Sequence, residues 1–372
     1  MLEHKAATST YDIDMKNSPF LKVVALILVF AFTILVPDLS KAAEQLVIFD
    51  NDWINETALV SLLAAPNVKV LGVVVTTGNE WRDEEADDVL RFFESMHISD
   101  VPVTVGAVYP MINSAARMEA WEKMYGQIPW KGAFNADSAG PQFHPDQPSK
   151  ITVPKDGLPR YLKISSTNAV EFMIEQVHAH PHEVTIFAGG PLTNIALAIR
   201  IDPDFSRLSK GLVFMGGNLK QIKDNGKFAS DFNFMFDPEA AHIALTADWP
   251  KIICVGDVSG DIGFPKSLVT EMQKKDSLAV QYFARHESEI GPWAWEDLAA
   301  AIIVDPTLVT DATDLTMDVD IDHGMNYGRA RVWPLSRGPK LGDRPVTVVS
   351  KVDTARFFSN YVQAAQSLGI RQ

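Results

Sequence analysis

Short apolar runs and longer amphipathic runs alternate along the chain from about residue 46 to residue 256. The short runs are rich in β-branched residues and predict strands at 46–50, 68–77, 101–107, 184–189, 211–217 and 251–256. The longer runs return an apolar residue every three or four positions, which predicts helices at 56–65, 83–96, 168–180, 191–201 and 237–247. This alternation is typical of an α/β fold with a mostly parallel sheet flanked by helices.

Two regions depart from the alternation. Residues 110–162 are rich in Pro, Gly, Trp and Tyr and show little periodicity, so they predict a long insertion over one end of the sheet. After Asp314, strand-like runs precede a helical run at 354–365, which predicts a C-terminal β-meander and helix. Because the chain shows no internal repeat and no low-complexity linker, we expect residues 43–372 to form one domain.

The first 42 residues are typical of an N-terminal extension that ends in a signal peptide. Two lysines precede an apolar run at 23–36, and small residues spaced for cleavage follow it at Ser40 and Ala42. A membrane anchor is the alternative, but this run is shorter than the roughly 20 residues that span a bilayer. We therefore expect cleavage after Ala42, export to a periplasmic or extracellular space, and no stable membrane span after cleavage.

Composition narrows the range of partners. The 372 residues carry 33 Lys and Arg against 47 Asp and Glu, a formal net charge of -14. This balance disfavours nucleic acid and anionic membrane surfaces, and it suits a neutral or cationic small molecule or a metal ion. The single cysteine, Cys254, lies in an apolar run and is expected to be a buried core residue. A homo-oligomer is compatible with the sequence, although no pattern indicates one.

Acids, amides and glycines follow several of the predicted strands. Asp50 and Asp52 close the first strand, Asn79 follows the second, and glycine-containing segments at 189–191 and 215–218 follow later ones. The carboxyl ends of parallel strands meet at one edge of a sheet, where ligands bind. Either acid alone could simply cap the next helix. Together with the other strand ends, however, they favour a site for a hard cation and a polyhydroxylated ligand.

Several motifs resemble those of the nucleoside hydrolases, the inosine-uridine preferring family. The segment at 50–59 is similar to the family's opening DxDxGxDDAxAL, and "VTIFAGGPLTNIALAIRIDPDFS" with "GLVFMGG" resembles its second block. The segment "NGKFASDFNFMFDPEAAHIAL" is similar to the family's N…AEFNxxxDPEAA, and "VTVVSKVDTARFF" to its closing strand and helix. The resemblance extends from about residue 46 to the end of the chain.

This resemblance implies that the protein hydrolyses the N-glycosidic bond of ribonucleosides or related ribosides, with water held by Ca²⁺. It implies that Asp52 is the catalytic base and a metal ligand, with the Gly189 carbonyl and Glu296 as further metal ligands and Asp50 as a supporting acid. The substrate-binding positions that it implies are Glu56, Asn79, Met215, Asn225, Asp231 and Asn233.

Some residues depart from the family pattern. Thr57 replaces the second of the family's paired acids, and Trp295 replaces the histidine before Glu296, so the usual leaving-group acid is missing. A non-catalytic ribose- or nucleoside-binding protein on the same fold therefore stays open as an alternative. Trp293 and Trp295 either stack on a nucleobase or fill the rim of the site. The acid pairs between residues 84 and 88 predict a solvent-exposed helix face.

Overall fold

The computed structural model describes residues 44–53, 57–135, 145–154, 156–219, 231–287 and 290–370. The predicted extension and signal peptide at 1–42 lie outside these ranges, as do Glu56 and Asn225. The described residues belong to one compact unit, Glu44–Gln372. Within them, no helix is both long enough and apolar enough to cross a membrane.

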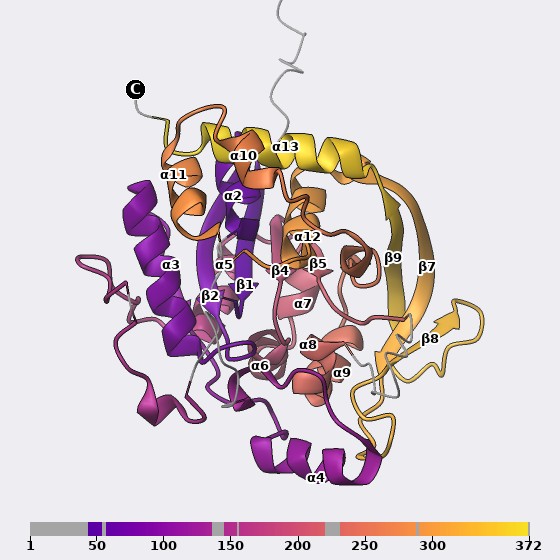
Figure 1. The fold of residues 1–372 in the computed structure, drawn as a ribbon. Coiled ribbons are helices and arrows are strands. Elements are labelled where there is room, and N and C mark those ends of the chain that lie inside the picture. Colours follow the sequence, from indigo (N-terminus) through magenta and orange to yellow (C-terminus); the bar gives the residue numbers. More distant parts are fainter. Residues whose placement is uncertain are drawn as a thin grey trace, which may run out of the picture. The chain divides into compact units, whose positions relative to one another are not determined.

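A sheet of nine strands among the described residues forms the centre of this unit, in the order β3-β2-β1-β4-β5-β6-β9-β7-β8 (Figure 1). Six strands pair in parallel at the positions that the sequence predicts, and they are β1 (Gln45–Asn51), β2 (Val68–Val75), β3 (Val103–Val105), β4 (Val184–Ala188), β5 (Gly211–Phe214) and β6 (Ile252–Cys254). The mostly parallel α/β fold is therefore confirmed.

The C-terminal strands are β7 (Val309–Val319), β8 (Ala330–Pro334) and β9 (Arg344–Val352). As predicted their pairing is antiparallel, since β7 pairs antiparallel with both β8 and β9. Their order is not the sequential one, because β9 passes to the far side of β7 and pairs in parallel with β6. The antiparallel strands thus extend the parallel sheet instead of forming a separate unit.

Helices cover both faces of the sheet because the strands bury side chains alternately on either side. On β1, Val47 and Phe49 join one apolar cluster, and Leu46 and Ile48 join the other. The first cluster includes α2 (Thr57–Ala64), α3 (Arg82–Met96), α10 (Leu268–Met272), α11 (Leu278–Arg285), α12 (Trp295–Val304) and α13 (Thr354–Ser367). The second includes α5 (Ala169–Ala179), α6 (Thr193–Ile201), α7 (Phe205–Leu208) and α9 (Pro238–Leu245).

The insertion contains more regular structure than its sequence predicts. It includes helix α4 (Ala115–Tyr125) and the short 3-10 helices η1 (Gly132–Phe134) and η2 (Pro148–Lys150). Figure 1 shows α4 at the end of the molecule opposite α13. Only Met118 and Trp121 of α4 are buried, too few to produce an amphipathic stripe in the sequence. Trp121 packs with Met235 and Tyr327, which fixes the insertion to distant parts of the chain.

Candidate functional site

The site lies where the order of the parallel strands reverses. From β1 the chain proceeds to β2 and β3 in one direction, and the later strands β4, β5 and β6 extend in the other. Asp50 and Asn51 end β1, with Asp52 directly after them, and Gly189 and Gly190 follow the neighbouring β4. Ligands of open α/β sheets bind in the crevice at such a reversal. The predicted location of the site at the carboxyl ends of the strands is therefore the one that the topology favours.

A cavity of about 410 Å³ opens at this edge of the sheet. It brings together residues that are far apart in the sequence, including five of the predicted site residues: Asn79, Met215, Asp231, Asn233 and Glu296. The other described residues that line it include Thr57, Asn218 and Asp297, and six aromatic residues: Trp53, Trp130, Phe232, Phe264, Trp293 and Trp295.

Asp52 is fully buried, next to Asn79 of the cavity lining. Its Oδ2 accepts hydrogen bonds from the backbone N–H of Asn79 at 2.7 Å and from the Asn79 side-chain amide at 3.2 Å. Trp130 Nε1 donates to Asn79 Oδ1 at 2.6 Å, which sets the direction in which that amide points. Asp52 Oδ1 has no hydrogen-bond partner among the described residues. One oxygen of this carboxylate is held in place, and the other is free to bind a ligand or accept a proton.

Two consecutive glycines bring the predicted metal ligands together. A Cβ atom added to Gly190 would lie 2.8 Å from Asp52 Oδ1, and one added to Gly189 would lie 2.8 Å from Glu296 Cγ. Both carboxylate side chains therefore pack directly against this backbone, at a distance that only glycine permits. Asp52, Gly189 and Glu296 converge, although they come from three separate parts of the chain: the residues just after β1 and just after β4, and the first turn of α12.

Several buried carboxyl groups lie close together in this space. Burial raises the pKa of Asp52 to about 7, although the Asn79 hydrogen bonds lower it, and the charge of Asp231 raises it further. Burial also raises the pKa of Asp231 to about 6. Burial, followed by the charges of Asp52 and Asp297, raises the pKa of Glu296 well above its ordinary range. No Lys or Arg is among the described residues that line the cavity. A bound cation would relieve this repulsion.

The donor atoms at this point fit a hard cation. Asp52, Glu296 and the Gly189 carbonyl offer only oxygen, which Ca²⁺ prefers, and one Asp52 oxygen is unpartnered. The described residues hold no cluster of three or more His, Cys, Asp or Glu side chains able to bind a metal. The third predicted ligand is a backbone carbonyl, that of Gly189. Thr57 adds no charge, because its side chain is a neutral hydroxyl. This hydroxyl hydrogen-bonds to Asp297.

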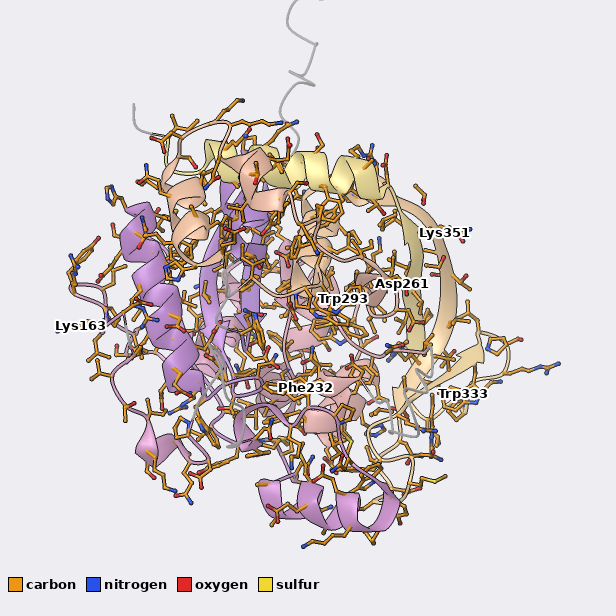
Figure 2. The ribbon with its side chains drawn as sticks, viewed as in Figure 1. Lys163, Phe232, Asp261, Trp293, Trp333 and Lys351 are labelled. Carbon is orange, nitrogen blue, oxygen red and sulfur yellow. The ribbon has the colours of Figure 1, made fainter. Side chains whose placement is uncertain are left out.

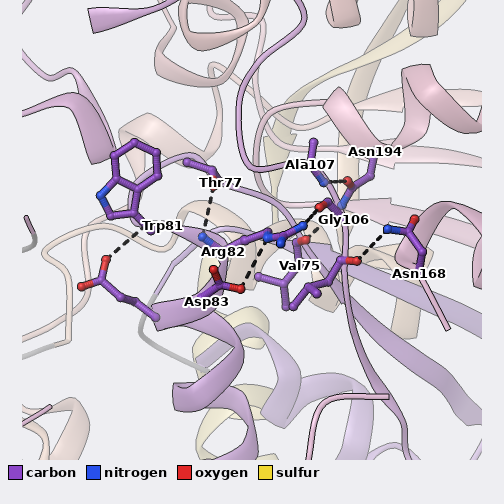
Figure 3. Close-up of polar contacts among 11 residues, drawn as sticks. Val75, Thr77, Trp81, Arg82, Asp83, Gly106, Ala107, Asn168 and Asn194 are labelled. Carbon is purple, nitrogen blue, oxygen red and sulfur yellow. Dashed lines mark hydrogen bonds and ion pairs between the residues drawn. The ribbon is translucent and has the colours of Figure 1, made fainter. Parts of the chain in front are cut away.

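Asp50 helps to fix the position of the site through a hydrogen bond with Asn194. Asn194, from α6, donates to Asp50 Oδ1 at 3.2 Å and to the Val75 carbonyl at 3.2 Å. Asn194 Oδ1 accepts from the backbone N–H of Ala107 at 2.8 Å, a contact that Figure 3 shows. The ends of β1 and β2 and the segment after β3 are thereby joined, which fixes the position from which Asp52 projects.

Two predicted ribose contacts are already engaged with the protein. Asn233 Nδ2 donates to the carbonyls of Gly189 at 2.7 Å and Met215 at 3.0 Å, whereas its Oδ1 has no partner among the described residues. Asp231 caps helix α8 (Phe232–Phe236) by accepting the backbone N–H of Phe234 at 3.0 Å. Both side chains line the cavity in fixed orientations, so they are suited to holding a polyhydroxylated ligand.

Sequence reasoning missed some residues of the site. Nothing in the insertion indicated that Trp130 would reach Asn79, because that contact depends on tertiary structure alone. The sequence did offer a signal for Asp297, because this acid directly follows Glu296, a predicted metal ligand. The predicted solvent-exposed helix face is wrong for Glu85, which is fully buried and accepts a hydrogen bond from Asn51 Nδ2 at 3.3 Å. It is also wrong for Asp88, which is buried and pairs with Arg91.

Sequence comparison finds relatives over most of the chain. The family described as inosine-uridine preferring nucleoside hydrolase matches residues 47–359. A probable uridine nucleosidase 1 of Oryza sativa subsp. japonica is 31% identical over 323 residues, which cover 82% of this chain and 92% of that protein. An uncharacterised protein of Schizosaccharomyces pombe is 29% identical over 345 residues, 86% of this chain and 85% of its own length.

Solved structures share the fold. An inosine-guanosine nucleoside hydrolase superposes with a TM-score of 0.69 at 20% identity, and a plant nucleoside hydrolase with a TM-score of 0.67 at 23% identity. Each alignment covers 87% of this chain and 99% of the other. At these identities the structural likeness shows only a shared fold. The relationship to the family rests on the sequence match over residues 47–359.

Proposed function

The chain belongs to the inosine-uridine preferring nucleoside hydrolase family, and on this premise we propose that it hydrolyses the N-glycosidic bond of a ribonucleoside or related riboside. The products are the free base and ribose. One observation supports the assignment above all: the buried, unpartnered Oδ1 of Asp52 lies against the Gly189–Gly190 backbone and near Glu296, where the strand order reverses.

A Ca²⁺ ion fits this site and would be held by the Asp52 carboxylate, the Gly189 carbonyl and the Glu296 carboxylate. When bound, it would position a water molecule and lower the pKa of that water. Asp52 then acts as the base and receives the proton of the attacking water on its carboxylate. The hydrogen bonds from Asn79 hold Oδ2 in place, so the carboxylate does not have to reorient during the reaction.

The ribose would lie among the polar side chains of the cavity. The free Oδ1 of Asn233 accepts a sugar hydroxyl, and Asp231 adds a carboxylate that is held by backbone N–H groups. Breaking the glycosidic bond produces an oxocarbenium-like, positively charged sugar, which this acidic pocket stabilises. Asn79 and Met215 line the same cavity, and Glu56 and Asn225 stay predictions from the family resemblance.

The test is direct. Purified protein is incubated with uridine and with inosine in the presence of Ca²⁺, and the release of ribose is measured by its reducing end. We expect ribose release that a chelator suppresses. Tight nucleoside binding without ribose release would instead favour the non-catalytic alternative. If the protein neither binds nor hydrolyses these nucleosides, the proposal is contradicted.

The destination of the protein is a separate proposal. We infer from the pattern of charged, apolar and small residues that residues 1–42 direct export and are removed. Sequencing the N-terminus of the exported protein should find it starting at Ala43. A protein that keeps residues 23–36 would support the membrane anchor instead. Sedimentation of the same sample measures its mass in solution and so tests whether the protein is a homo-oligomer.

A further inference from the structure

Aromatic side chains form much of the cavity above the acidic site. Six of the described lining residues are Trp or Phe, and they come from five separate segments of the chain. The rings of Trp293 and Trp295 lie 6.3 Å apart between centroids, at 57° to one another. Trp293 is 41% exposed, at the mouth of the cavity. Figure 2 labels Trp293 and Phe232, which line the cavity from the segment before α12 and from α8.

The acids of the cavity are committed to other partners. Asp231 accepts backbone hydrogen bonds from Gly217, Asn233 and Phe234. Asp297 is hydrogen-bonded to the hydroxyls of Thr57 and Tyr361. Among the described lining residues there is no His, Lys, Arg, Tyr or Cys. Glu296 is the remaining acid, and it is assigned to the metal. With Glu296 so engaged, the described cavity combines carboxylates and aromatic faces, and it offers no side chain suited to donating a proton to a leaving base.

This combination matters for the leaving group. When water attacks C1′ of a neutral nucleoside, the electron pair of the C1′–N bond leaves with the base, and the base must gain a proton to become neutral. A riboside whose base is already a cation differs. The same electron pair neutralises the ring, so the products are ribose, a neutral base and one proton from the water. Such a substrate does not require a leaving-group acid.

The same cavity is suited to recognising a cation. Aromatic faces attract positive charge through their negative π-surfaces, most strongly for Trp, and nearby carboxylates add to this attraction. We propose that the preferred substrates are N-ribosylated heteroaromatic cations, such as pyridinium ribosides or N7-alkylated purine ribosides. This inference rests on the proposed glycosidase function and specifies the aglycone that the site accepts.

The experiment compares matched substrates. Guanosine and 7-methylguanosine differ by one methyl group, and nicotinamide riboside supplies a pyridinium arm. For each, kcat/KM is measured with Ca²⁺, after subtraction of the rate with Asp52→Asn, which accounts for spontaneous hydrolysis. We expect kcat/KM for 7-methylguanosine to exceed that for guanosine by about 100-fold or more, the size of a general acid's contribution.

Variants at Trp293 and Trp295 separate recognition of the cationic base from leaving-group chemistry. Trp295→His, which restores a proton donor, should raise kcat on guanosine about 10-fold or more while 7-methylguanosine gains little, and Trp295→Phe should not reproduce this. Trp293→Leu removes the π-face but keeps apolar volume, so it should raise KM for nicotinamide riboside more than Trp293→Phe does.

The outcomes distinguish this inference from the proposed function. Equal kcat/KM on guanosine and 7-methylguanosine, or a preference for guanosine, would overturn the inference and leave the glycosidase assignment intact. Hydrolysis of none of the three substrates, nor of uridine and inosine, would overturn both.

Discussion

Replacing Asp52 with Asn should abolish hydrolysis and, at the same time, stabilise the metal-free protein. The side chain is fully buried and one of its oxygens has no partner among the described residues. In Asp52→Asn the amide oxygen can still accept the hydrogen bonds from Asn79, and the NH₂ group takes the place of the unpartnered oxygen. The variant keeps the shape of the side chain and removes its charge.

The size of the effect follows from the pKa. Burial raises the pKa of Asp52 from its ordinary value of 3.8 to about 7, so between these values the folded protein binds more protons than the unfolded chain. Stability is therefore lost as the pH rises through this window. Since one pKa unit corresponds to about 1.4 kcal/mol, the Asp52 side chain costs the metal-free fold about 4 kcal/mol at pH 8, where it is ionised, and about 2 kcal/mol at pH 5, where it takes up a proton on folding.

Urea unfolding of both proteins at pH 5 and pH 8, in the presence of a chelator, measures this difference. At pH 8 the Asn variant should be more stable than the wild type by up to about 4 kcal/mol, and the gap should narrow at pH 5. Added Ca²⁺ should stabilise the wild type far more than the variant, because the ion binds the folded state through the carboxylate. The exposed acid Asp100 provides the control, since Asp100→Asn should leave both curves unchanged.

Two results would refute this reasoning. If Asp52→Asn turned over nucleosides at near the wild-type rate, Asp52 would not be the base. If the variant were no more stable than the wild type at pH 8 without metal, the carboxylate would not carry an uncompensated charge in the folded protein.

Three further substitutions test other parts of the site. Trp130→Phe removes the donor to Asn79 and should lower kcat about 10-fold with little change in KM, whereas Trp121→Phe, the same change away from the site, should leave kcat unaltered. Asn233→Ala should weaken ribose binding by about 1–2 kcal/mol in calorimetry, and unchanged affinity would place the sugar elsewhere. Thr57→Asp should destabilise the metal-free protein, because it brings a second carboxylate to Asp297, and should increase the rise in melting temperature caused by Ca²⁺. An equal rise in both proteins would show that position 57 does not face the ion.

The amino-acid sequence by itself determined the α/β architecture and the edge of the sheet that carries the site. Strands buried on both faces require near-continuous apolar runs, and the helices between them require apolar residues at every third or fourth position. Both patterns are local, so they can be read along the chain. The predicted donors Asp52, Gly189 and Glu296 likewise belong to motifs that keep their spacing, and the fold brings them together.

Only the tertiary structure decided the features that depend on contacts between distant segments. The bond from Trp130 to Asn79 joins residues 51 positions apart, and the buried Glu85 accepts a hydrogen bond from Asn51, 34 positions away. The position of β9 between β6 and β7 also depends on pairing partners. A side chain's local pattern records whether it faces a core or solvent. It does not record which distant polar group will satisfy it, because that choice is made by packing across the whole fold.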